Sequence, residues 1–498
     1  MTCRLSCLAC MAVALAIAPR TADAVQGAAA SPRPVRNIVF FLVDDMRYDA
    51  MGFVGNPLAR TPAIDALAGG GVHFRNAFVT TSLCSPSRAS FLTGLYAHRH
   101  QVLDNVTPMN PDLPTFPRLL QQAGFRTAFV GKWHMGGASD DPRPGFDFWA
   151  SFRGQGDYFV NRFNINGRRE EIREYVTDAI TRMSLEWLRA EPGRPFLLYM
   201  SHKAVHSAFH PAPRHADALA DVPVRLPESA EDSPDNAFRR PRWVLQQRLS
   251  WHGVDDFYHK ADDRPLRLLI RDYYRSMMAV DESLGALVAA LKELGLFDST
   301  LIILAGDNGF LWGEHGLIDK RCMYEESIRI PLVASCPALW GSRARTVDRM
   351  VLNLDVCPTI LEAAGLDIPP EIQGRSFLQL PDRPDMPWRD AFLYTYFWEE
   401  AFPETPTVLG VRTDRHKLMR YHGVWDTDEL YDLADDPREM HNRLLVTRRK
   451  QVRPDEGYVE VYRDLSRRLD ALLEETGALR LPTWTKPGAA PASRPAAE

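Results

Sequence analysis

The chain alternates between short continuous apolar runs and longer segments in which apolar residues recur with helical periodicity. The first apolar run covers residues 37–43, and similar runs recur at 127–130, 196–200, 300–305 and 330–334. Runs of this kind are typical of strands buried on both faces of a parallel sheet. The segments with helical periodicity are residues 63–67, 116–123, 175–190 and 270–294. This alternation predicts an α/β fold with a doubly wound, mixed sheet flanked by helices.

The pattern changes past residue 382. Three strand-like segments follow, at 391–397, 407–412 and 417–421, and then an amphipathic segment at 459–475. We therefore predict a large α/β domain over residues 36–381 and a smaller antiparallel sheet with a helix over 382–482. Residues 211–263 have weak periodicity and predict a long loop. The low-complexity end, 483–498, is predicted to be disordered.

The N-terminus has the pattern of an export signal. Arg4 precedes an apolar run over residues 7–18, and small residues up to Ala24 fit a cleavage site. We predict a signal peptide over 1–24 and a linker over 25–35, and therefore a secreted or periplasmic protein. A membrane anchor is the weaker alternative, because a span needs about 20 apolar residues. A lipoprotein signal ending at Cys10 is a further alternative.

Composition narrows the partners of the mature chain. The 498 residues are 45% hydrophobic and 25% charged, with a net charge of -5. The charges are interspersed, so no basic stripe proposes nucleic acid as a partner. No later segment has the length of a membrane span, which predicts a soluble mature protein. Signal cleavage leaves four cysteines, enough for at most two disulfides. These are Cys84, Cys322, Cys336 and Cys357.

Polar side chains follow the ends of the predicted strands, where ligands bind in open α/β sheets. They are Asp44 and Asp45, then Lys132 and His134, then His202, Lys203 and His206, and finally Asp307 and Asn308. Each pair alone is as well explained by a helix cap or an Asx turn. Three carboxylates and an amide at one sheet edge would repel each other without a cation. Because all four ligands are oxygens, they favour Ca²⁺ or Mg²⁺.

A short helix is predicted from Cys84 to the glycine at position 94, in the segment CSPSRASFLTG. Ser85 is in place to cap the helix, Pro86 fits its first position and Gly94 fits its end. The helix N-terminus favours an anion beside Cys84. Arg88 lies one turn further along the same face. The alternative is a half-buried structural cysteine.

This segment resembles the signature C-x-P-S-R-x-x-x-L-T-G of the type I sulfatases at every fixed position. The resemblance continues in the family's order through VDD, GKWHMG, SHKAVH, GDNG and GEHGLIDKR. It covers residues 36–335 well and the C-terminal part loosely. The family's fold is an alkaline-phosphatase-like α/β domain with a smaller C-terminal sheet, which agrees with the pattern of elements described above.

The resemblance implies a role for each matching residue. The metal ligands would be Asp44, Asp45, Asp307, Asn308 and the modified Cys84, with calcium as the usual ion. Cys84 would be oxidised to formylglycine by a maturation enzyme, and its hydrate would attack sulfur. The remaining catalytic residues would be Arg88, Lys132 and Lys320 around the sulfate, His134 beside the hydrate, and His206 as the acid for the leaving group. His206 and Lys320 would also bind the substrate.

Several features leave alternatives open. His202 and His210 are rivals of His206, because Ala208 stands where the family often has proline. Cys322, Cys336 and Cys357 are predicted to be buried thiols. Asn105 begins a glycosylation sequon that matters only in a eukaryotic secretory route. Four tryptophans could stack on a substrate ring or simply pack in the core. They are Trp133, Trp243, Trp251 and Trp312.

The sequence around Cys84 and the ending DELYDLADDPREMHN resemble secreted carbohydrate sulfatases of the N-acetylglucosamine-6-sulfatase branch. We therefore expect hydrolysis of a sulfated saccharide, such as a glycosaminoglycan fragment, or of an aryl sulfate. A phosphonate or phosphate monoester hydrolase of the same superfamily is the first alternative. A non-catalytic protein that binds sulfated glycans is the second, and the full set of polar site residues argues against it.

Overall fold

The structure is a computed structural model that describes residues 35–230, 239–248, 250, 253–254, 265–422, 426–446 and 452–478. The predicted signal peptide, nearly all of the linker, Trp251 and the C-terminal tail lie outside these residues. The predicted boundary between the two domains at residues 381 and 382 stays a prediction.

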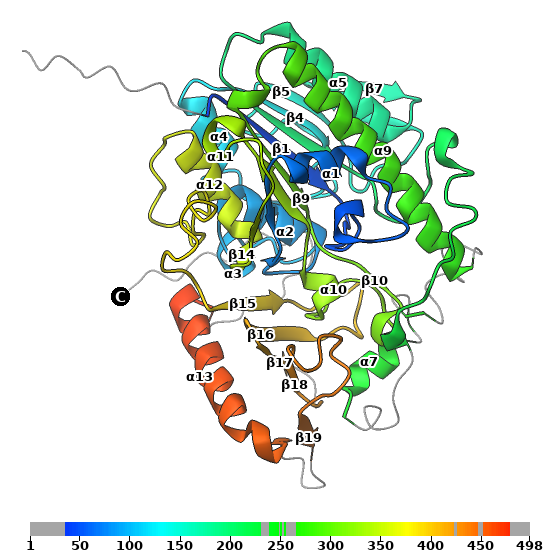
Figure 1. Ribbon diagram of the computed structural model, residues 1–498, viewed down its shortest axis with the longest axis vertical. Helices are drawn as coiled ribbons and strands as arrows, with labels where there is room; N and C mark the ends of the chain where they lie inside the picture. Colours follow the sequence, from blue (N-terminus) through cyan, green and yellow to red (C-terminus); the bar gives the residue numbers. More distant parts are fainter. Residues whose placement is uncertain are drawn as a thin grey trace, which may run out of the picture. The chain divides into compact units, whose positions relative to one another are not determined.

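A ten-stranded mixed sheet forms the centre of the α/β domain (Figure 1). Its order is β13-β2-β12-β9-β1-β8-β4-β5-β6-β7. Five central strands, β9, β1, β8, β4 and β5, run parallel to one another. The apolar run at 330–334 was expected to be another parallel strand, but β12 pairs antiparallel with both of its neighbours. The strands are β1 (Asn37–Val43), β2 (Val72–Phe74), β4 (Arg126–Lys132), β5 (Phe148–Phe152), β6 (Asn161–Ile165), β7 (Arg168–Ile172), β8 (Phe196–His202), β9 (Thr300–Gly306), β12 (Leu332–Ser335) and β13 (Arg345–Val347).

Helices cover both faces of this sheet, because successive side chains of a strand point to opposite faces. In β1, Phe40 packs into one hydrophobic cluster and Phe41 into the other, and both are fully buried. One face is covered by α1 (Pro62–Gly69), α5 (Val176–Ala190) and α9 (Leu266–Glu293). The other is covered by α2 (Cys84–Thr93), α4 (Phe116–Gln122) and α12 (Val356–Ala363). The doubly wound fold expected from the sequence is confirmed.

Short elements fill the connections between the large ones. The segment expected to be one long loop contains short helices in its described part, among them α7 (Arg242–Gln247). Two-stranded pairings are formed by β10 with β11 and by β3 with β14. The remaining short elements are β3 (Ala77–Phe78), β10 (Leu311–Trp312), β11 (Ile318–Asp319), β14 (Val351–Leu352), α3 (Ala97–His100), α10 (Glu325–Ile328) and α11 (Pro337–Trp340).

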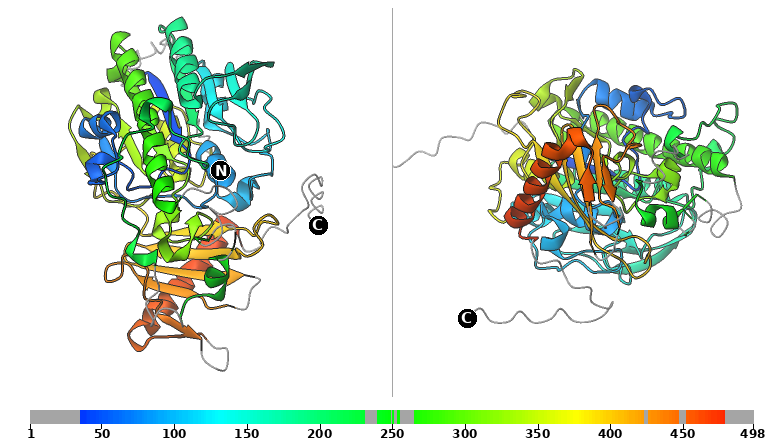
Figure 2. Two further views of the ribbon diagram at one scale, coloured as in Figure 1. Left: turned by 90° about the vertical axis from the view of Figure 1, so that its right-hand side faces the viewer. Right: turned by 90° about the horizontal axis from the view of Figure 1, so that it is seen from below.

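An antiparallel sheet follows near the C-terminus, as the change in pattern predicted. Its order is β15-β16-β17-β18, and α13 packs across the first three strands (Figure 2). Buried Leu465 and Leu469 of α13 lie one helical turn apart and join the same hydrophobic cluster as α2. The elements are β15 (Ala391–Tyr396), β16 (Thr407–Thr413), β17 (His416–His422), β18 (Glu429–Asp432), β19 (Leu444–Val446), β20 (Val452–Pro454) and α13 (Val459–Thr476).

A buried ion-pair network joins this sheet to α10 of the α/β domain. Lys417 is fully buried in β17, and its Nζ lies 2.9 Å from Glu325 Oε1 and 2.7 Å from Glu439 Oε1. Arg412 makes two further contacts of 3.1 Å to the Glu325 carboxylate. Burial raises the pKa of Glu439 to about 7, although Lys417 opposes that shift. The lysine therefore stabilises two carboxylates that have little access to water.

Replacing Lys417 with methionine should destabilise the protein strongly, because it leaves those two carboxylates without their shared cation. We expect a loss of about 3–5 kcal/mol in the free energy of unfolding, measured by urea denaturation. The matched control is Arg420→Met on the same strand, whose ion pair with Asp470 is partly exposed. That change should cost less than about 1 kcal/mol. Equal losses in the two variants would contradict this account of the network.

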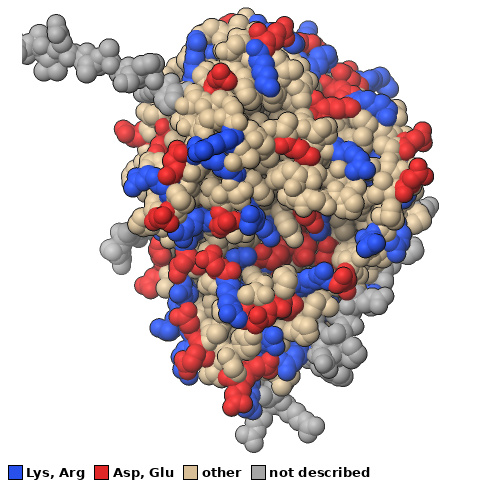
Figure 3. Space-filling model, viewed as in Figure 1, with Lys and Arg blue, Asp and Glu red and all other residues tan. Residues whose placement is uncertain are grey.

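The distribution of surface charge and the burial of the cysteines agree with what the sequence predicted. On the face drawn in Figure 3, acidic and basic side chains are interspersed, and no continuous basic area is seen there. Within the described residues, no helix has the length and apolarity needed to cross a membrane. The four cysteines predicted for the mature chain are all buried and free, so the described structure pairs none of them in a disulfide.

Candidate active site

The helix α2 carries Cys84 at its first residue, and all ten residues of the helix are buried. Ser85 was expected to cap this helix, but it lies inside the first turn, and its backbone N–H donates to Asn105 Oδ1 at 3.0 Å. The cap therefore comes from a side chain twenty positions further along the chain. Gly94 ends the helix as predicted, with a φ of 69° that glycine adopts without strain.

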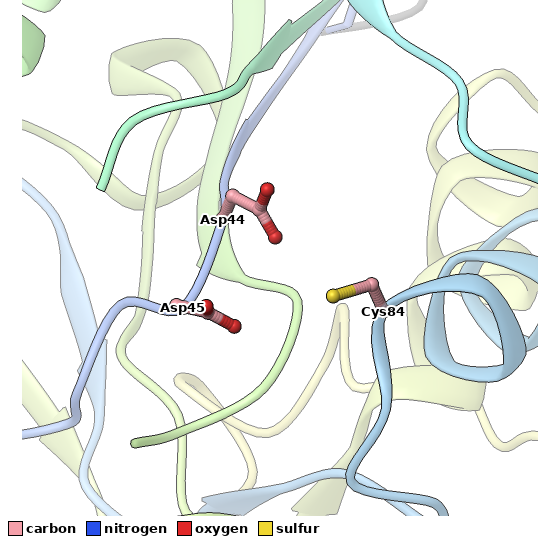
Figure 4. A group of neighbouring side chains, drawn as sticks. All are labelled: Asp44, Asp45 and Cys84. Atoms are coloured by element: carbon pink, nitrogen blue, oxygen red, sulfur yellow. The ribbon is translucent and has the colours of Figure 1, made fainter. Parts of the chain in front are cut away.

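Two carboxylates face Cys84 across the end of β1. Figure 4 shows Asp44 and Asp45 directed toward the sulfur atom. One ligand atom from each of the three residues lies within 4.8 Å of the other two, and all three residues are buried. Asp45 has a φ of 55°, a left-handed conformation that a chain turning sharply out of a strand adopts. The structure therefore brings these three candidate residues together.

Asp307 and Asn308 reach the same place from the end of β9. Asp307 Oδ1 accepts a hydrogen bond of 2.9 Å from the Asp45 backbone N–H, and Asn308 Nδ2 donates to Asp45 Oδ1 at 2.7 Å. Parallel pairing of β1 with β9 places these strand ends side by side. Arg88 adds a contact of 2.8 Å from its Nε to Asp307 Oδ2. All four oxygen-bearing residues therefore lie at one sheet edge.

Two lysines neutralise the aspartates. Lys320 Nζ lies 2.6 Å and 2.8 Å from the two carboxylate oxygens of Asp45. Lys132 Nζ contacts Asp44 Oδ2, and its backbone oxygen accepts a hydrogen bond of 2.7 Å from Arg88 Nη1. Lys320 and Lys132 are both buried. The cations predicted from the sequence thus surround the predicted metal ligands.

Of the candidate histidines, His206 and His134 belong to this site. His206 Nε2 lies 3.8 Å from Asp45 Oδ2. His134 is buried with a φ of 69°, and its charge interactions are with Lys132, Asp44, Arg88 and His206. His202 instead contacts Ser283 Oγ at 3.3 Å and packs against Phe41. His210 lies against the rings of Tyr158 and Phe159. The spacing argument for His206 agrees with this placement.

The carboxylates interact strongly enough that their titrations are linked. Burial and the neighbouring Asp44 carboxylate together raise the pKa of Asp307 to about 7, although Arg88 opposes this shift. Burial also raises the pKa of Asp45. Burial would raise the pKa of Asp44 as well, but Lys132, His206 and Arg88 outweigh burial and hold it well below its ordinary value. The site therefore holds one firmly ionised carboxylate beside two that favour a bound proton or cation.

The thiol and the two imidazoles are held in their neutral forms. Burial raises the pKa of the Cys84 thiol well above its ordinary range, although Lys132 and Lys320 oppose this. An unmodified Cys84 is therefore a poor nucleophile at neutral pH, since the thiolate is the reactive form. Burial and Lys132 lower the pKa values of His134 and His206 well below 6.5.

Sequence reasoning missed several residues that shape the site. Ser201 Oγ accepts a hydrogen bond of 2.7 Å from Arg88 and donates one of 2.7 Å to the Lys132 backbone oxygen. Its place in SHKAVH, directly before His202, was the only sequence signal. Asn105 was noted only as a sequon, and Tyr158 gave no signal. The described tryptophans Trp133, Trp243 and Trp312 are buried among aromatic side chains, which favours core packing over ring stacking.

The residues present fit a divalent cation. Asp44 Oδ1 and Asn308 Oδ1 are buried and accept no hydrogen bond from the described residues, although Arg88 Nη2 lies 3.5 Å from Asp44 Oδ1. A buried oxygen without a hydrogen bond costs free energy unless a cation or a water contacts it. Carboxylate and amide oxygens are ligands for hard ions such as calcium and magnesium. The geometry therefore supports a site for a hard divalent cation.

The chain belongs to the sulfatase family, whose family model matches residues 36–366. A second model, described as the C-terminal part of N-sulphoglucosamine sulphohydrolase, matches residues 313–474. An N-acetylglucosamine-6-O-sulfatase of Bacteroides thetaiotaomicron is 32% identical over 469 residues, which cover 82% of this chain and 82% of that protein. The resemblance found in the motifs is thereby confirmed, and the protein is a sulfatase.

Solved structures show the same architecture. One is a complex of a protein with its substrate D-glucosamine-2-N,6-O-disulfate; it has a TM-score of 0.79 and 30% identity and covers 89% of this chain and 99% of that one. The phosphonate monoester hydrolase of Agrobacterium radiobacter has a TM-score of 0.70 at 22% identity, covering 89% of this chain and 96% of that one. This second likeness shows the shared fold alone. The alkaline-phosphatase-like α/β fold predicted from the sequence is confirmed.

Proposed function

We propose that the protein is a formylglycine-dependent sulfatase that releases sulfate from the 6-position of a glucosamine-type residue in a sulfated saccharide. The observation that carries this proposal is the meeting of Cys84, the buried aspartates and a set of buried cations at one sheet edge. A sulfate monoester spreads negative charge over three oxygens, so a site for it needs fixed cations and a proton donor.

The buried cations are proposed to have two functions: the lysines bind the sulfate, and the arginine orients the site. Lys132 and Lys320 would hold the sulfate oxygens, because both ammonium groups lie close enough to Cys84 to act on its thiol electrostatically. Arg88 is itself fixed by Asp307, Ser201 and the Lys132 backbone, so it orients the site around Cys84. Fixed charges of this kind stabilise a transition state without having to reorganise during the reaction.

His206 is proposed to donate a proton to the leaving oxygen, and His134 to support the modified Cys84. In the substrate-free protein, Lys132 and Lys320 help to lower the pKa of His206. A bound sulfate ester would neutralise these two lysines and so remove part of the cause of that shift. Substrate binding would therefore favour the protonated, acid form of His206.

Asp44, Asp45, Asp307 and Asn308 are proposed to hold calcium, with magnesium as the alternative, and the modified Cys84 would complete the ligand set. The cation would supply positive charge that stabilises developing negative charge. Formylglycine, made from Cys84 by a maturation enzyme, would supply the nucleophilic oxygen. An aldehyde at this position does not depend on a thiolate, which agrees with the burial that keeps the Cys84 thiol protonated.

The substrate class is supported by two comparisons, the N-acetylglucosamine-6-O-sulfatase and the structure with a bound glucosamine disulfate. We expect a sulfated saccharide substrate to be located outside the cytoplasm. We therefore also propose export through the predicted signal peptide, giving a secreted or periplasmic enzyme.

The test is sulfate release from a panel that contains N-acetylglucosamine 6-sulfate, its 3-sulfate isomer, an aryl sulfate and a phenyl phosphonate. We expect the 6-sulfate to have a kcat/KM at least about 10-fold above that of its isomer, because a misplaced reacting group loses the benefit of orientation. Ion chromatography of free sulfate measures the rates. Turnover of the phosphonate far above every sulfate would instead establish the phosphonate hydrolase alternative. Activity on aryl sulfate alone would overturn the saccharide assignment.

A further inference from the structure

The loop after β8 folds around the carbonyl oxygen of Ser207. His206 Nδ1 lies 2.8 Å from this oxygen, and Lys203 Nζ lies 3.4 Å from it. The His206 backbone N–H also donates to the Lys203 carbonyl oxygen at 3.0 Å. Because a carbonyl oxygen can only accept a hydrogen bond, His206 Nδ1 is a donor and keeps its proton. The other ring nitrogen, Nε2, is the one that faces Asp45 and the site.

Tyr158 supports the same loop from the connection between β5 and β6. Its hydroxyl donates to the His206 carbonyl oxygen at 2.6 Å, and Lys203 Nζ lies 4.7 Å from the centre of its ring. Tyr158 and Lys203 are 1% and 3% exposed, so both contacts are shielded from water. One tyrosine thus holds the backbone of His206 through its hydroxyl and holds Lys203 through its ring.

A buried lysine with so few partners needs an explanation other than stability. Burial and the nearby Lys132 lower the pKa of Lys203 to about 8, so its charged form is disfavoured there. Among the described residues, its Nζ closely contacts one carbonyl oxygen and one aromatic face, while Asp44, Asp157 and Asp45 act on it through longer-range charge interactions. An apolar side chain of similar length would avoid the cost of removing the ammonium from water.

We propose that Lys203 and Tyr158 are positioning residues that hold the His206 ring with Nε2 directed at the leaving oxygen of the substrate. The inference rests on the proposed function, in which His206 protonates that oxygen. As the bond between sulfur and the bridging oxygen breaks, its electron pair stays on the oxygen, and the Nε2 proton moves to the same atom. A ring turned about its side-chain bonds would present no donor there.

The test compares leaving groups that differ in their need for a proton. Tyr158→Phe and Lys203→Met are assayed on nitrophenyl sulfate, phenyl sulfate and N-acetylglucosamine 6-sulfate. A sugar alcohol is a poor leaving group, so its kcat should fall by about 10- to 100-fold, a part of the full contribution of a positioned acid. Nitrophenolate leaves without a proton, and its kcat should fall by less than about 3-fold.

Tyr175→Phe is the matched control. The Tyr175 ring stacks on Tyr158 at 5.8 Å, and its hydroxyl donates to the His210 carbonyl oxygen at 3.0 Å in the same loop. This variant should show the same dependence on the leaving group as the wild-type protein. In a Tyr158→Phe, His206→Ala double variant, the tyrosine change should have no further effect on the sugar sulfate.

Equal losses for all three substrates would overturn the proposal, because they would indicate a general structural role. Crystal structures of Tyr158→Phe and Lys203→Met give a readout that does not depend on activity, since the His206 ring should turn away from Ser207. An unmoved ring would also overturn the proposal. If wild-type protein releases no sulfate at all, the proposed function fails, and the ring orientation still decides whether these two residues position His206.

Discussion

Replacing Cys84 with alanine should abolish sulfate release while the protein keeps its fold. Cys84 is fully buried at the start of α2, and burial keeps its thiol protonated. The nucleophilic oxygen is proposed to come from the modified side chain of Cys84, so this variant would lack the nucleophile. We expect kcat to fall by roughly 10⁴- to 10⁶-fold, as when the nucleophile of another hydrolase is removed.

The control for this experiment is Cys357→Ala. Cys357 is also fully buried, in α12 on the same face of the sheet, and its thiol interacts with the backbone of Phe116 in α4. It should lose some stability and no more than a few-fold in kcat, because only a small buried group is removed. Mass spectrometry of the peptide carrying Cys84 should show an aldehyde in active wild-type protein. Full activity with an unmodified thiol would contradict the proposed chemistry.

The sequence predicted the parts of the site that follow directly from strand ends. Apolar runs locate strands, and parallel strands bring their carboxyl ends to one edge, so Asp44 and Asp307 had to meet. The orientation of β12 was missed, because an apolar run carries no information about the direction of its neighbour. Strand direction depends on the length and course of the connection, which composition does not reveal.

Residues that support the site from distant segments could not be predicted. Asn105 caps α2 and Tyr158 holds His206, but each lies in a loop whose path is set by tertiary packing. Ser85 was a reasonable cap on residue type alone, since serine is favoured at that position. The structure uses Ser85 inside the helix because Leu83, in an extended conformation, precedes the first turn. Local preference was overridden by the way the segment enters the core.

Removing the proposed calcium ion should have the second largest effect on activity, and its effect on stability should depend on pH. Chelation with EDTA followed by dialysis should lower kcat/KM by at least about 10²-fold, since a bound cation contributes several kcal/mol of charge stabilisation. Calcium should restore activity better than magnesium. The Asp307→Ala variant, which lacks one proposed ligand, should gain little from added calcium.

The pH dependence follows from the carboxylates in the metal-free protein. The pKa of Asp307 is raised by burial and by Asp44 to about 7, from an ordinary value of 3.8. The shift therefore stabilises the folded, metal-free protein over the unfolded chain below about pH 4, and this contribution to the free energy of unfolding is lost as the pH rises toward 7. Calcium at the proposed site would replace the proton and remove that loss of stability, whereas at low pH it would have to compete with the proton. The rise in Tm on adding calcium should thus be larger at pH 8 than at pH 5.5, measured by differential scanning calorimetry. A rise that is equal at both pH values, or larger at pH 5.5, would show that calcium does not bind through Asp307.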